Sequence, residues 1–356
     1  MQTTLLGLAM ALILALIAAL VGPYFIDWNQ FRPQFEAEAA RVIGAPVRVV
    51  GALDARLLPV PSLRLRSVVV GGANDPGRVR ADKLDVDFSL GSLMRGEWRA
   101  DELTINGFAL DLGLDAQGKL DWPASGLSNL AALTVDRLNL TGRIALHDAA
   151  SRSTVELNDI AFSGELRAQA GSLRGDGNFL LSGTRYPFRL SSGRPADGNG
   201  TRLHLTLDPG ARALSADLDG LLTFEARSPR FDGALVLAAP APAKANAVEA
   251  ARTPWRIAGR VKADPAAAKF EQVEASWGPE DRALKLAGAA MLKFGASPRL
   301  QAAMSARQLD ADRLLAADGP EPVHWLSKLR SLAAAMPQPP LATQIEVSAE
   351  QIMLGG

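Results

Sequence analysis

The sequence predicts a mainly β protein with an N-terminal transmembrane helix, a large antiparallel β-sheet and a few short helices. One observation behind this prediction is an uncharged apolar run within residues 1–26. Another is the alternation of apolar and polar residues, with a period of two, in many short segments beyond Pro46. The third is composition, because 48% of the 356 residues are apolar, which is enough for a packed core.

Composition also excludes several classes of function. The chain has 38 basic and 38 acidic residues, so its net charge is zero and we expect no nucleic-acid partner. It has no cysteine, which excludes thiolate metal sites, cysteine nucleophiles and disulfides. Only three histidines are available for acid–base chemistry.

Residues 1–26 are predicted to form a transmembrane anchor. The run Leu5–Val21 reads LLGLAMALILALIAALV and no charged residue occurs before Asp27. About 20 apolar residues in a helix span the hydrocarbon core of a bilayer. A cleaved signal peptide is the competing interpretation, but no Lys or Arg precedes the run and Val21–Phe25 is a poor cleavage site. The predicted membrane-anchor residues are Leu5, Leu12, Leu16 and Leu20.

Residues 27–45 are predicted to form an amphipathic connecting helix. Phe31, Phe35, Ala39 and Val42 fall on one helical face, and Gly44 followed by a proline ends the helix. The helix can lie on the bilayer surface or cover the end of a sheet. We favour the sheet because the polar face of the helix is not cationic.

The first β segment is predicted over residues 46–237. Its alternation is clear in LRLRS, KLDVDFSL and RLNL, and turn-forming residues separate the segments at about 8 to 14 residues, the spacing of antiparallel strands. The alternation changes parity across Gly107 and across residues 158–159. Such a change keeps the apolar residues on one face only if a β-bulge inserts a residue, so we expect a curved sheet.

The rest of the chain continues this pattern with two interruptions. Residues 238–254 form an Ala/Pro-rich linker, and residues 255–315 continue the β segment. Residues 316–342 are predicted to form a proline-flanked helix, and residues 343–356 to begin a further strand of a longer, truncated array.

Alternation alone does not decide what covers the apolar face of the sheet. A sandwich buries it against a second sheet, a barrel closes around it, and a groove leaves it open to an apolar ligand. The residues predict no catalytic site, no metal site and no cofactor. The pairs Asp85/Asp87, Asp217/Asp219 and Asp310/Asp312, together with His147 and His204, are interpreted as polar positions on solvated strand faces.

The stretch Asp27–Gly72 resembles the N-terminal region of the AsmA family, with a Trp-led helix ended by glycine and the LLPVP turn at Leu57–Pro61. Gly96–Trp122, Trp255–Gly278 and Ser305–Leu315 are similar too, so the resemblance extends over essentially the whole chain. It implies a repeating β-groove, an elongated and curved antiparallel sheet with an apolar interior. It also implies a single-pass inner-membrane protein with its bulk in the periplasm, and no enzymatic activity.

For the function, the resemblance implies a groove that binds phospholipid acyl chains and conducts them toward the outer membrane, supporting outer-membrane integrity. A periplasmic or outer-membrane protein is an expected partner at the distal end. The alternative is a periplasmic scaffold for outer-membrane protein biogenesis with no lipid inside, and an anchored hydrolase is a third hypothesis. Apolar positions of alternating strands are the candidate groove residues: Leu63, Leu65, Leu84, Val86, Phe88, Leu103, Ile105, Leu138, Leu140, Leu203, Leu205, Leu284 and Leu286.

Overall fold

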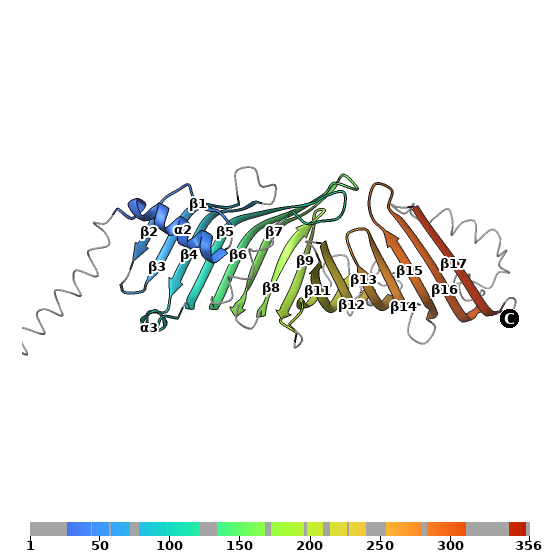
Figure 1. Ribbon diagram of the computed structural model, residues 1–356. Helices are drawn as coiled ribbons and strands as arrows, with labels where there is room; N and C mark the ends of the chain where they lie inside the picture. Colours follow the sequence, from blue (N-terminus) through green and yellow to red (C-terminus); the bar gives the residue numbers. More distant parts are fainter. Residues whose placement is uncertain are drawn as a thin grey trace, which may run out of the picture. The chain divides into compact units, whose positions relative to one another are not determined.

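The computed structural model of the chain is mainly β, with strands that follow one another along the sequence and few helices (Figure 1). It describes residues 27–43, 45–56, 58–71, 78–97, 99–121, 134–167, 172–195, 198–208, 214–225, 228–239, 254–278, 283–310 and 342–353. The predicted anchor in residues 1–26, the predicted helix before Ala342 and most of the predicted linker lie outside the described residues. No helix in the described part is long and apolar enough to cross a membrane.

The chain divides into two compact units. Unit 1 comprises Met1–Ala149 and Ser153–Leu205, and unit 2 comprises Ala150–Arg152 and Thr206–Gly356. The division falls within strand β10 (Thr201–Leu207).

Unit 1 is built from strands that pair in sequence order. β1 and β2 both pair with β3, and each later strand pairs with the one that follows it. The strands of unit 1 before β10 are β1 (Val47–Val49), β2 (Leu53–Arg56), β3 (Ser62–Val70), β4 (Arg78–Phe88), β5 (Arg99–Leu114), β6 (Thr134–Asp148), β7 (Ser153–Arg167), β8 (Ser172–Leu181) and β9 (Thr184–Gly193).

One pairing in unit 1 corrects the expectation of a fully antiparallel sheet. β5 and β6 are parallel, with Leu103 opposite Leu138 and Ile105 opposite Leu140. The chain therefore returns between Leu114 and Thr134 to the end of the sheet at which β5 began. A two-residue period has no direction, so it cannot distinguish parallel from antiparallel neighbours.

Two helical segments cover the first strands of unit 1 on one face (Figure 1). They are η2 (Trp28–Phe31) and α2 (Arg32–Ile43), and a third, α3 (Leu90–Met94), connects β4 to β5. Phe35, Ala39 and Ala40 of α2 pack against a buried cluster that includes Val47 and Val49.

Polar contacts fix this helical segment on the sheet as well. The backbone N–H of Val49 donates to Glu36 Oε1 at 2.7 Å, and Arg32 Nη2 donates to the carbonyl oxygen of Gly51 at 2.8 Å. The side chain of Asp27 accepts from the N–H of Asn29 and caps the start of η2. The helix therefore covers the end of a sheet, as the polarity of its outer face suggests.

The predicted bulges are present in unit 1. Gly107 has φ of +65° and the pairing of β5 with β6 shifts between Asn106 and Phe108. Asp159 has φ of +48° and the pairing of β7 with β8 shifts between Asn158 and Ala161. Each bulge re-aims the following side chains to the apolar face and increases the local twist.

Unit 2 repeats the same architecture. Its strands pair in sequence order and antiparallel from β11 to β16, and β17 then pairs parallel to β16. This is the second correction to the antiparallel expectation. The strands are β11 (Ser215–Glu225), β12 (Ser228–Ala239), β13 (Trp255–Ala263), β14 (Ala267–Trp277), β15 (Leu284–Lys293), β16 (Arg299–Asp310) and β17 (Ala342–Met353).

Candidate functional site

Two neighbouring rows of apolar residues cross unit 1 from β3 to β9, one residue from each strand. Residues directly opposite one another on paired strands project from the same face of the sheet, so each row marks one line on a single face. The first row is Leu65, Leu84, Ile105, Leu140, Phe162, Gly177 and Phe188. The second row is Leu63, Val86, Leu103, Leu138, Gly164, Gly175 and Leu190.

These rows, which we call the apolar face of unit 1, contain most of the residues proposed from the sequence as groove positions. Phe88 packs against the same cluster. The structure therefore brings together Leu63, Leu65, Leu84, Val86, Phe88, Leu103, Ile105, Leu138 and Leu140.

The apolar face is well packed although no second sheet lies on it among the described elements. Val86, Leu138 and Phe162 are only 9%, 5% and 7% exposed. The helical segments with substantial contacts to described strands, α2 and η2, lie on β1 and β2. Side chains on one face bury one another in this way when the sheet curves toward that face, since curvature brings the rows together. The apolar face is thus the inner side of an open, curved sheet.

An aromatic cluster occupies the apolar face over β7, β8 and β9. The ring centroids of Phe162 and Phe188 are 6.1 Å apart, and Phe179 lies 5.7 Å from both Phe188 and Tyr186. The strand between these rings carries Gly175 and Gly177, which leave room for them. A Cβ at Gly175 would lie 2.6 Å from Phe162 Cζ.

Sequence reasoning missed this cluster, and a weaker signal for it exists. In the β8 sequence SLRGDGNFLL, every second residue lies on the apolar face, including Leu173, Gly175, Gly177 and Phe179. Two of these residues are glycine, which has no apolar side chain, so the alternation of apolar and polar residues is not visible there. A period-two pattern in which glycine stands for an apolar residue would have extended the prediction through β9.

The remaining proposed groove residues lie elsewhere. Leu203 and Leu205 are half-buried in β10, at the end of unit 1. Leu284 and Leu286 lie in unit 2, where they face Trp277 and Ala275. The anchor residues Leu5, Leu12, Leu16 and Leu20 lie outside the described residues.

Unit 2 has an apolar face of its own, lined by smaller and more exposed side chains. Ile257 is 40% exposed and Trp277 is 55% exposed. One of its rows is Leu237, Ile257, Ala275 and Leu286, and another is Gly233, Val261, Phe270, Ala290, Ala302 and Ile345.

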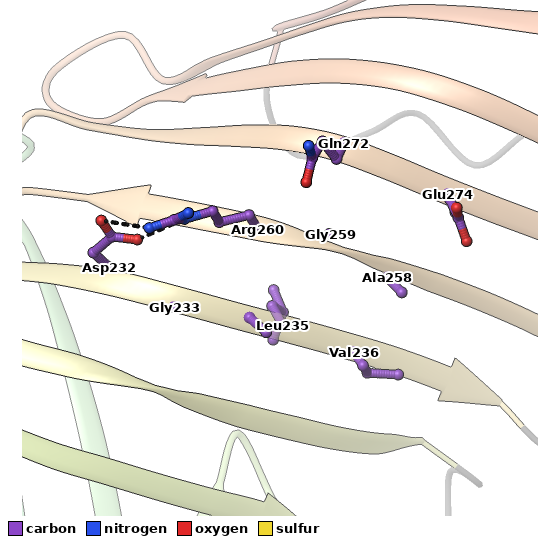
Figure 2. A pocket seen from close by; sticks show the side chains of 10 residues that line it. Asp232, Gly233, Leu235, Val236, Ala258, Gly259, Arg260, Gln272 and Glu274 are labelled. Atoms are coloured by element: carbon purple, nitrogen blue, oxygen red, sulfur yellow. Dashed lines mark hydrogen bonds and ion pairs between the residues drawn. The ribbon is translucent and has the colours of Figure 1, made fainter.

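The polar face of unit 2 carries paired charges around a shallow depression of about 470 Å³ (Figure 2). Arg260 of β13 donates from Nε and Nη2 to the two carboxylate oxygens of Asp232 at 2.9 and 3.1 Å. These hydrogen bonds lower the pKa of Asp232 and raise the pKa of Arg260. Lys262 pairs with Glu271 at 3.0 Å. Mutually paired, exposed charges are typical of a solvated strand face.

Two of the carboxylates considered from the sequence, Asp85 and Asp217, are half-buried, whereas the two histidines are exposed. Asp85 pairs with Lys83, and Asp217 accepts a hydrogen bond from Thr206 Oγ1 at 3.1 Å. His147 is exposed and its Nδ1 lies 3.0 Å from Thr154 Oγ1, and His204 is also exposed. Within the described ranges, no group of three or more His, Asp or Glu side chains is arranged to hold a metal ion.

The fold and these surfaces define an open β-sheet protein with one apolar and one polar face. Comparison with known proteins adds the family. Residues 2–164 match the AsmA family, so the chain is AsmA-like over this N-terminal part, as the residues of the helix, the LLPVP turn and the following strands indicate. The match includes Gly96–Trp122 but does not extend to Trp255–Gly278 or Ser305–Leu315. No curated protein and no solved structure matches the chain.

Proposed function

We propose that the chain is a single-pass inner-membrane protein whose periplasmic sheet binds phospholipid acyl chains on its apolar face and conducts them toward the outer membrane. The observation that carries the proposal is the pair of apolar rows across β3 to β9. The described helical segments pack only on the cluster at the β3 end, which includes Leu65. An acyl chain is a suitable occupant because it is apolar along its whole length, as the rows are.

The energetics favour such an occupant. Each CH₂ group removed from water contributes roughly 0.8 kcal/mol. A lipid outside a bilayer therefore needs an apolar surface that continues for several strands. Half-buried residues such as Leu103, Leu140 and Leu190 offer this surface, since part of each side chain remains accessible.

The location of the protein follows from the same proposal. An anchor in residues 1–26 places Asp27 and the first strands next to the inner membrane, where lipid enters the sheet. The match of residues 2–164 to the AsmA family supports a role related to the outer membrane. We propose that a periplasmic or outer-membrane protein receives the lipid at the distal end.

Photocrosslinking in cells tests the proposal, because neighbouring residues of one strand lie on opposite faces. A photoreactive phenylalanine analogue replaces Leu140, on the apolar face, or Thr141, which is exposed on the polar face and donates to Asn106. Cells are grown with radiolabelled phosphate, and the purified full chain is examined for label. We expect labelled phospholipid on the Leu140 variant and background on the Thr141 variant.

Two results would overturn the proposal. Equal labelling at Leu140 and Thr141 would mean that the face has no part in binding lipid. No labelling at Leu140, with an outer-membrane protein crosslinked there instead, would support the scaffold alternative. Thermal unfolding of both variants checks that the fold is intact.

A further inference from the structure

From Leu190 to the β8–β9 turn, the side chains of β9 on the apolar face change from aliphatic to hydroxyl-bearing. On the other side of Leu190, the Ser192 hydroxyl accepts a hydrogen bond from the backbone N–H of Leu173 at 3.1 Å. Leu190, Phe188, Tyr186 and Thr184 alternate with exposed residues and so share one face. Thr184 directly follows the Ser182–Gly183 turn, which ends the β8–β9 hairpin. The hydroxyl-bearing end of this series therefore lies where strands β8 and β9 meet their connecting turn, and there the apolar face meets solvent.

The two hydroxyl groups at this edge are available to a ligand. In the described part of the chain, neither the Tyr186 nor the Thr184 hydroxyl has a hydrogen-bond partner, and neither is buried. The ring of Tyr186 is held in place by Phe179, with centroids 5.7 Å apart and planes 28° apart. Tyrosine prefers such a boundary because its ring is apolar and its hydroxyl is polar.

The apolar face along β8 and β9 is long enough to hold an acyl chain of one bilayer leaflet. Apolar side chains of β8 extend from Leu173 through Phe179, opposite Tyr186, to Leu181, opposite Thr184, and the six residue steps from Leu173 to Phe179 span about 20 Å. One leaflet contributes about 15 Å to the hydrocarbon core of a bilayer. An acyl chain lying along β8 and β9 thus fits between Leu173 and Tyr186, with the ester and headgroup beyond Tyr186.

From this series we infer a lipid-orienting site in unit 1. The Tyr186 hydroxyl donates a hydrogen bond to an ester or phosphate oxygen of a phospholipid, Thr184 contacts its headgroup, and its acyl chains lie on Phe162, Phe188 and Leu190. The inference rests on the proposed function and adds the direction in which the lipid lies. The headgroup is at the β8–β9 turn and the tails extend toward Leu173.

Fluorescence quenching tests the orientation in the full chain. The chain has no cysteine, so a single introduced cysteine carries the only bimane label. Leu190→Cys and Thr184→Cys report the two ends of the site, and Pro187→Cys reports the exposed opposite face. Each labelled protein is mixed with micelles containing phosphatidylethanolamine that carries a nitroxide on the headgroup or at the end of an acyl chain.

We expect the headgroup nitroxide to quench the label at Thr184→Cys at least two-fold more than the acyl-chain nitroxide does, and the reverse ratio at Leu190→Cys. The label at Pro187→Cys should be quenched by neither. The same ratio at both positions would overturn the orientation and leave lipid binding intact. An absence of quenching at both positions would overturn the proposed function as well.

Removal of one hydroxyl tests the role of Tyr186. Tyr186→Phe keeps the ring and its contact with Phe179, so folding is preserved. We expect the lipid fraction for half-maximal quenching at Leu190→Cys to rise about five-fold, the value of one hydrogen bond of about 1 kcal/mol. Thr141→Val removes a hydroxyl from the polar face and should change nothing. An unchanged lipid fraction in Tyr186→Phe would exclude the hydrogen bond.

Discussion

The rings of Phe162 and Phe188 stack across a strand to which neither belongs. Their centroids are 6.1 Å apart and their planes differ by 12°, although Phe162 lies in β7, Phe188 in β9 and β8 runs between them. Gly177 of β8 is paired with both residues. Because Gly177 has no side chain, the two rings can meet above its backbone. The rings cover the glycine and keep the apolar face continuous.

Gly177→Ala should therefore destabilise unit 1. A Cβ at Gly177 would overlap the carbonyl oxygen of Ala161 and would lie 3.0 Å from two ring carbons of Phe188. The backbone oxygen cannot move aside cheaply, so we expect a loss of about 1 to 3 kcal/mol, more than alanine gains from its smaller unfolded-state entropy. Hydrogen–deuterium exchange of β8 and β9 peptides measures the loss.

Gly193→Ala is the matched control for this prediction. Gly193 also lies in β9, but no atom would be within 4 Å of its Cβ. Exchange should stay within about 0.5 kcal/mol of the parent protein. Equal effects of the two substitutions would mean that the ring contact has no bearing on the stability of the strand.

The bulge at Gly107 gives a second prediction. Gly107 has φ of +65°, and a Cβ there would overlap the carboxylate of Asp82. An L-residue in this backbone conformation costs about 1 to 2 kcal/mol, so Gly107→Ala should lower the stability of β5 by at least that amount. Urea unfolding followed by circular dichroism measures the change.

Gly113→Ala serves as its control in the same strand. Its nearest non-neighbouring atom is Asp121 Cβ at 3.6 Å, an ordinary contact, and its φ lies outside the left-handed region. If Gly107→Ala unfolded at the same urea concentration as Gly113→Ala, the bulge would not depend on glycine.

Much of the apolar face of unit 1 could be predicted from sequence because large aliphatic residues alternate in β3 to β6. The prediction of bulges at Gly107 and Asp159 was possible for the same reason, since a change of parity in a strand with one apolar face requires an extra residue. The predicted groove residues include none from β7, β8 or β9, where Gly164, Gly175 and Gly177 stand in place of apolar side chains.

The two parallel pairings could not be predicted, because they depend on contacts between distant residues. The parallel pairing of β5 with β6 is accompanied by ion pairs such as Arg99 with Asp136 at 2.7 Å and Arg143 with Asp111 at 3.2 Å. Each partner by itself is an ordinary charge on a polar strand face. Only the register shows that they complement one another.

The Asp232–Arg260 pair gives a prediction for pH. The hydrogen bonds from Arg260 lower the pKa of Asp232 in the folded state. Since the folded pKa is below the unfolded one, the stabilisation is present at pH values above the ordinary aspartate pKa and is lost as the pH falls through the lowered value. Asp232→Asn should thus unfold at a lower urea concentration than the parent protein at pH 7.

The difference between Asp232→Asn and the parent protein should disappear in acid and shrink at high salt, because the pair is exposed. Glu274→Gln is the control, because it changes an exposed carboxylate in β14, the strand next to that of Arg260. Asp264→Asn would not serve, because the Asp264 side chain accepts backbone hydrogen bonds. A difference that persists at pH 3 would show that the carboxylate charge is not its cause.

The two apolar faces should respond differently to truncation of one side chain. Leu138, in unit 1, is 5% exposed and lies between Leu103 and Gly164, whereas Ile257, in unit 2, is 40% exposed. Leu138→Ala should lower stability by about 2 to 5 kcal/mol because it leaves a cavity among its neighbours. Ile257→Ala should cost less than about 1 kcal/mol, since much of the side chain already faces solvent. Hydrogen–deuterium exchange of β6 and β13 peptides separates the two effects within one protein, and a loss at β13 as large as that at β6 would contradict the more exposed character of the unit 2 face.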